Sequence, residues 1–155
     1  LKEKEKLMKR TLQATLLLTL LPISLTAQDS DFRMNQEFAD HFAKEWIEAW
    51  NAHDLERILS HYTDEFRMSS PRIIDLGFSN TGTLQGKEAM REYWGPSLVE
   101  GSSVQFELIN TYVGANSVTI HYRSISNDRL ATEVFVFDEH GEVTEAFAHY
   151  LPPRP

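Results

Sequence analysis

The chain has 155 residues, of which 41% are hydrophobic and 11% aromatic, and its formal net charge is −8. This length and composition indicate one domain with a substantial apolar core and exclude a disordered chain. The chain contains no cysteine, which excludes disulfides, thiolate metal sites and cysteine nucleophiles.

Residues 1–27 have the three regions of a secretory signal peptide: basic LKEKEKLMKR, apolar TLQATLLLTLLPISL and a small residue, Ala27, at the cleavage point. We expect the true start to be Met8, and the cleaved protein to be periplasmic or secreted; a retained anchor is the alternative. The segment holds five of the 15 basic and two of the 23 acidic residues, so its removal leaves a net charge of −11. Such a charge argues against binding to nucleic acids and to membranes after cleavage.

Apolar residues spaced by three and four predict an amphipathic helix over residues 32–50, with Asp31 as its N-cap. Asp54 is expected to cap a second, short helix. A short strand over residues 66–69 then ends at Ser70 and Pro71, because proline cannot donate to a strand ladder.

The rest of the chain predicts a loop, a helix and a sheet. Residues 71–85 are rich in Gly, Ser and Asn and predict a loop, and a third helix over 86–94 ends at Gly95-Pro96. Short turns separate four predicted strands, which should therefore pair antiparallel, at 104–113, 117–126, 129–137 and 142–150. The fold class is thus α+β, with N-terminal helices packed on an antiparallel sheet. The tail, residues 152–155, should be loose.

Strand alternation predicts which side chains of the sheet face the helices. The more apolar set on the first two strands is Phe106, Leu108, Ile120, Tyr122 and Ser124. On the third strand alternation leaves both sets open, because both are largely apolar. Two apolar faces indicate that both are covered, which favours a homodimer through the sheet.

Three segments carry a family resemblance: NAHDLERILSHYTDEFRMSSP (51–71), GKEAMREYW (86–94) and EVFVFDEHGEV (133–143). With them the chain resembles the nuclear-transport-factor-2-like superfamily, in its SnoaL-like and ketosteroid isomerase-like branch. The resemblance implies that residues 28–151 form a cone-shaped domain, in which a strongly curved sheet encloses a pocket at its wide end. Members are commonly dimers. Because this fold hosts many unrelated activities, the resemblance says more about fold than about chemistry.

The same resemblance implies site residues. In ketosteroid isomerases the residue before the strand-ending proline is the aspartate base, and here it is Ser70. The position of the oxyanion-binding tyrosine holds Trp46, and that of the second oxyanion donor, a carboxylic acid, holds Glu133. Glu133, Phe135 and Phe137 should then face the pocket. Two further positions match aromatic pocket residues of the family, Tyr93 and Trp94.

Glu133 is the candidate catalytic residue. A carboxyl within an apolar strand should keep its proton above the ordinary pH range or find a donor, and it can then serve as a general acid/base or as a polar anchor. The alternative is a sheet glutamate that faces solvent or a partner. Ser70 cannot act as a base at neutral pH, but it can position a water or a ligand oxygen. The remaining predicted pocket residues, which could equally be core, are Trp46, Tyr93, Trp94, Tyr122 and Phe135.

The sequence shows no metal or cofactor signature. The six histidines form no close pair of the metal-binding type, and no phosphate loop or dinucleotide fingerprint is present. The leading hypothesis is a pocket for a small, largely apolar organic molecule. If the protein is an enzyme, the classes implied are isomerase, dehydratase, cyclase or epoxide hydrolase. The alternatives are a non-catalytic binder and an interaction module whose outer sheet face carries Ile109, Ile125, Val134, Val136 and Phe147.

Overall fold

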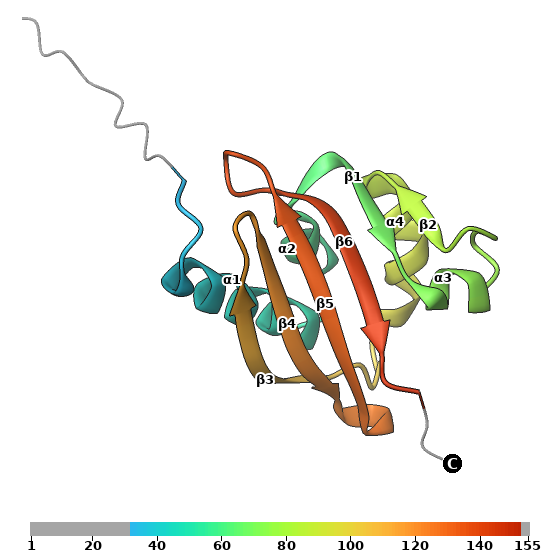
Figure 1. Cartoon of the computed structure of the whole chain (residues 1–155). Helices are drawn as coiled ribbons and strands as arrows, with labels where there is room; N and C mark the ends of the chain where they lie inside the picture. The colour runs from blue at the N-terminus through green and yellow to red at the C-terminus, as the bar shows by residue number, and fades with distance from the viewer. Residues whose placement is uncertain (1–31, 153–155) are drawn as a thin grey trace, which may run out of the picture.

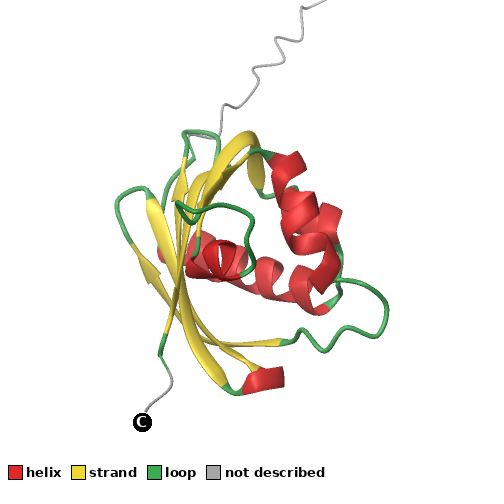
Figure 2. Cartoon of the chain, turned by 90° about the vertical axis from the view of Figure 1, so that its right-hand side faces the viewer, coloured by secondary structure: helices red, strands yellow, loops and turns green. Residues whose placement is uncertain are grey.

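The computed structural model describes residues 32–152. The predicted signal segment, its cleavage point and Asp31 lie outside this range, and the signal segment and its cleavage point are not tested by it. A six-stranded sheet curls around the helices, which lie on its concave side (Figures 1 and 2). The fold is therefore the predicted α+β cone. Within the described residues, none of the helices has the length and apolar character needed to span a membrane.

The helices and strands alternate only in the first half of the chain. The helical segments are α1 (Gln36–Asn51), α2 (Leu55–Leu59), α3 (Pro71–Asp75), α4 (Lys87–Trp94) and the 3₁₀ turns η1 (Gly95–Ser97) and η2 (Ile125–Asn127). The strands are β1 (Tyr62–Ser69), β2 (Thr83–Gln85), β3 (Phe106–Val113), β4 (Ser117–Ser124), β5 (Arg129–Phe137) and β6 (Val143–Tyr150). The strand order in the sheet is β2-β1-β6-β5-β4-β3.

The last four strands form the predicted antiparallel meander. The sheet also contains a parallel pair, because β1 lies beside β6. A parallel pair requires a long crossover connection, and the chain between β1 and β6 provides it. The first strand begins at Tyr62, four residues earlier than the sequence predicted.

The first helix begins later than predicted. Asn35, and not the predicted Asp31, caps it: the Asn35 side chain accepts a hydrogen bond of 2.8 Å from the amide of Phe38. Phe32 precedes the helix and packs edge-on against Phe38, with ring centroids 4.7 Å apart. The apolar spacing continued into this extended segment because its side chains also pack on the core. Periodicity alone does not distinguish such a segment from a helix.

The predicted loop over residues 71–85 is wrong, since it contains α3 and β2. Ser70 is the N-cap of α3, and its hydroxyl accepts a hydrogen bond of 3.2 Å from the Arg72 amide. Pro71 therefore ends β1 and begins a helix, at the position where a missing N–H costs nothing. β2 pairs with β1 through Ser69 and Thr83.

The inward face of the sheet follows the implied parity. Buried inward residues on three adjacent strands are Val118, Ile120, Tyr122, Ala131, Glu133, Phe135, Phe137, Ala146 and Ala148. Leu108 departs from the prediction because it lies on the edge strand β3, beside a register shift, and is 36% exposed.

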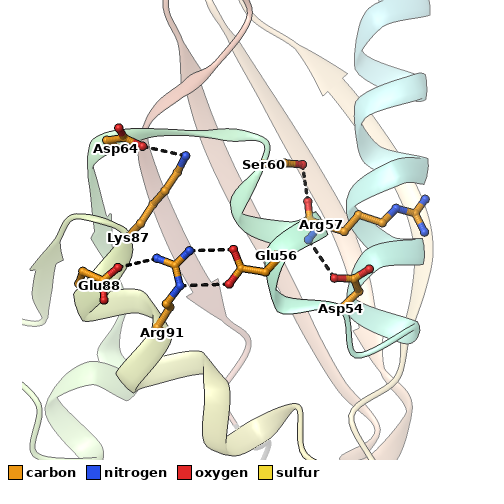
Figure 3. Close-up of polar contacts among 8 residues, drawn as sticks. All are labelled: Asp54, Glu56, Arg57, Ser60, Asp64, Lys87, Glu88 and Arg91. Carbon is orange, nitrogen blue, oxygen red and sulfur yellow. Dashed lines mark hydrogen bonds and ion pairs between the residues drawn. The ribbon is translucent and has the colours of Figure 1, made fainter.

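Ion pairs join the short helices outside the core (Figure 3). Arg91 on α4 contacts both carboxylate oxygens of Glu56 on α2, at 3.1 and 2.7 Å, and also contacts Glu88 at 2.8 Å. Lys87 lies 3.0 Å from Asp64. These groups are largely solvated, so their contribution to stability is modest.

Candidate functional site

A cavity of about 210 Å³ lies between the helices and the concave face of the sheet. Its walls are mainly aromatic: Trp46, Trp50, Tyr93, Trp94, Phe106, Tyr122 and Tyr150. Its polar residues come largely from α3, η1, η2 and the start of β5: Arg72, Ser97, Ser126, Asn127 and Arg129. α3 and η2 lie at the end of the cone where β6 finishes (Figure 1). The cavity thus combines an apolar body with a polar rim, as ligand pockets do.

Glu133 is the one acidic residue that lines this cavity. It is only 4% exposed, and its Oε1 has no hydrogen-bond partner among the described residues. Burial raises the pKa of Glu133 to about 8, and the Tyr122 hydroxyl partly opposes this rise. Desolvation disfavours the charged form, so the carboxyl is mostly protonated at pH 7. In that state it is a hydrogen-bond donor.

Several buried tyrosine hydroxyls are affected by the charge of Glu133. Burial, and next the charge of Glu133, raise the pKa values of Tyr62, Tyr122 and Tyr150, that of Tyr150 to about 12. These hydroxyls therefore stay neutral and can donate or accept hydrogen bonds without changing charge.

Five of the seven sequence-predicted site residues line the cavity: Trp46, Tyr93, Trp94, Tyr122 and Glu133. The Trp46 indole N–H already donates to the Tyr62 hydroxyl, at 3.0 Å. It is therefore not free to replace an oxyanion-binding tyrosine. Phe135 is fully buried, packs against Phe42 and Trp46, and is not a lining residue. The ligand contacts of these residues stay predictions.

Ser70 is buried, and it is not a lining residue either. Its hydroxyl lies 3.5 Å from that of Tyr150, which does line the cavity. Ser70 therefore belongs to the supporting layer: it caps α3 and contacts the cavity through Tyr150. The sequence could not show this, because the helix that Ser70 caps was not predicted.

Several lining residues were not among those predicted from the sequence. Tyr150 could have been found by alternation, since it pairs with Ala131 and lies two residues from Ala148, the partner of Glu133. Arg72 and Arg129 carried no signal, because charged residues in turns and short helices are usually solvated.

Within residues 32–152, no three His, Asp or Glu side chains gather closely enough to hold a metal ion. His121 and His149 line a separate, shallow hollow together with Leu130 and Thr132. On their strands these four residues alternate with buried, inward-facing ones: Tyr122, Ala148, Ala131 and Glu133. These histidines therefore belong to the outer face of the sheet and not to the cavity.

The cone and its aromatic cavity with one buried carboxyl define a protein of the nuclear-transport-factor-2-like class. A model of the SnoaL-like domain matches residues 43–146, and the chain belongs to this family. A SnoaL-like protein of unknown function from Burkholderia thailandensis is 47% identical, with a TM-score of 0.73 over 78% of this chain and 100% of that one. No curated protein matches the chain.

More distant structures share the fold alone. SalBIII, described as an epoxide hydrolase/cyclase-like enzyme in pyran ring formation in the polyether salinomycin, is 19% identical, with a TM-score of 0.59 over 76% of this chain and 93% of its own. A nuclear-transport-factor-2-like protein of unknown function from Cytophaga hutchinsonii is 14% identical, with a TM-score of 0.56 over 74% and 90%.

Proposed function

We propose that this protein binds a small, largely apolar organic molecule in the aromatic cavity, with Glu133 as its polar contact. The observation that carries the proposal is the buried Glu133 carboxyl, whose Oε1 has no hydrogen-bond partner among residues 32–152. A buried polar group with an unsatisfied atom costs stability, and such exceptions are characteristic of functional sites.

The chemistry that this carboxyl supports is cofactor-free acid/base catalysis. A neutral carboxyl can donate a proton or a hydrogen bond to a carbonyl, hydroxyl or epoxide oxygen, and the carboxylate left behind can take a proton back. Ser70 does not supply a second base, so Glu133 would serve in both steps. This is consistent with cyclase, dehydratase, isomerase or epoxide hydrolase chemistry. The similarity to SalBIII supports the fold as a host for such reactions.

A thermal-shift titration of residues 28–155 tests the proposal. The panel consists of one- and two-ring compounds that carry a carbonyl, hydroxyl or epoxide. A ligand at a hundred times its Kd adds about 2.7 kcal/mol of stability, a shift of several degrees for a domain of this size. We expect a hit whose affinity falls about tenfold in Glu133→Gln, since a Gln amide is a weaker hydrogen-bond donor than a neutral carboxyl. A hit that is then turned over by the wild type and not by Glu133→Gln establishes an enzyme, whereas binding without turnover establishes a binding protein.

A panel without any hit would contradict the proposal and favour the interaction-module alternative. Ile109 and Ile125 support that alternative, since they are 44% and 48% exposed.

A further inference from the structure

Two arginines reach the cavity from separate parts of the chain. Arg72 comes from the first turn of α3, and Arg129 is the first residue of β5. Glu133, the single acidic lining residue, is mostly neutral at pH 7. The cavity is therefore electropositive, although the chain as a whole has a formal net charge of −8.

Neither arginine is neutralised by a carboxylate of the described residues. Among the ion pairs of residues 32–152 none involves Arg72 or Arg129, whereas other arginines of the domain do pair with carboxylates: Arg57, Arg67, Arg91 and Arg123. Asp128, next to Arg129 in sequence, lies 3.6 Å from Arg123 instead. The two guanidinium groups at the cavity are thus available to an external anion.

Arg129 is held against Tyr150, and the same tyrosine lies beside the cap of the helix that carries Arg72. The guanidinium carbon of Arg129 lies 4.8 Å from the centre of the Tyr150 ring, and its Nε donates to the Leu151 carbonyl at 3.5 Å. This arrangement orients Arg129 and leaves its terminal nitrogens without a protein acceptor among the described residues. Arg72 lies two residues after Ser70, the cap of α3, and the Ser70 hydroxyl lies 3.5 Å from that of Tyr150.

We propose that the ligand of this cavity is a carboxylate, whose anionic group is held at the rim by Arg72 and Arg129 while its one- or two-ring apolar body lies against the aromatic walls toward Glu133. This inference rests on the proposed function and specifies its ligand class. Guanidinium groups bind planar oxyanions through paired, charge-assisted hydrogen bonds. A cavity of about 210 Å³ is smaller than a drug-sized pocket. It favours the compact carboxylate over a phosphate ester, whose higher charge also costs more to desolvate.

The test compares matched pairs of ring carboxylates and their neutral carboxamides: benzoate with benzamide, cyclohexanecarboxylate with its amide, and 2-naphthoate with 2-naphthamide. Affinities are measured by calorimetry at pH 7 on the full chain. The variants are Arg72→Gln, Arg129→Gln and the double variant. The control is Arg67→Gln, which removes a surface arginine that pairs with Glu145 and does not line the cavity.

We expect at least one carboxylate to bind about tenfold or more tightly than its amide in the wild type and in Arg67→Gln. The double variant should lose this preference while it keeps the affinity for the amide. Each single variant should lose part of it. Raising the salt concentration should weaken carboxylate binding and leave amide binding unchanged.

Equal affinity for carboxylate and amide, or a preference that survives in the double variant, would overturn the inference and leave the apolar pocket in place. If no member of any pair binds, while circular dichroism shows a folded protein, both the inference and the proposed function are overturned. The two failures are therefore distinguishable.

Discussion

Glu133 is the residue at which stability and function oppose each other. Its folded-state pKa is raised to about 8 from an ordinary value of 4.5, because burial penalises the charged form. A group whose pKa is raised on folding contributes stability that is fully present below the unfolded-state pKa and is lost as the pH rises through the folded-state pKa. The contribution of Glu133 to the stability of the wild type should therefore fall between about pH 4.5 and pH 8.

This pH dependence should disappear in Glu133→Gln, which has nearly the same shape and no titration. We expect the unfolding free energy of the wild type, relative to that of the variant, to fall by up to about 5 kcal/mol across that range. Urea unfolding at pH 5, 6.5 and 8 measures it. A difference that stays constant with pH would mean that the carboxyl is solvated or ionised in the folded protein.

At the scale of the elements, α3 connects the sheet to the cavity rim. This helix is one of the short elements that periodicity could not predict, and it begins with the buried cap Ser70 and with Pro71. It carries Arg72 at the cavity, and its C-cap Leu76 also lines the cavity. The position that holds a catalytic base in ketosteroid isomerases has here become a structural cap.

Ser70→Ala should therefore weaken α3 without removing a catalytic group. We expect a loss of about 1 kcal/mol in unfolding free energy, the usual value for an N-cap. Chemical denaturation measures it. Ser70→Asn, which can cap in the same way, should lose less despite its larger side chain. If turnover of an identified substrate fell a hundredfold or more in Ser70→Ala at unchanged stability, Ser70 would be catalytic and this assignment would be wrong.

At the scale of the whole molecule, the outer face of the sheet carries apolar side chains that the single chain covers only in part. Val134, Val136 and Phe147 lie on it and are half-buried within the single chain. An apolar outer face on an antiparallel sheet is typical of an association surface. We propose that two copies of the domain pack through this face, as the sequence predicted.

Light scattering coupled to size exclusion should then show a dimer for residues 28–155. Val134→Glu, in the middle of the face, should shift it to a monomer that remains folded, because an interface of about 800 Å² per partner tolerates no central unpaired charge. Val99→Glu is the matched control, since Val99 lies in the loop after η1 and is 57% exposed. A wild-type monomer at high concentration would refute the dimer.

The amino-acid sequence by itself determined the order of the long elements, the four-stranded meander and the unusual carboxyl of β5. These features depend on local periodicity, turn residues and composition, which a single chain displays directly. Motif resemblance, and not alternation, correctly oriented Glu133, because both faces of β5 are apolar.

Only the tertiary structure decided the short elements α3 and β2, the role of Ser70, the occupied indole of Trp46 and the presence of Arg72 and Arg129 at one cavity. The physical reason is common to all of them. A short helix or edge strand forms because distant residues pack on it or pair with it, and the charge state of a carboxyl or the availability of a donor depends on neighbours far away in sequence.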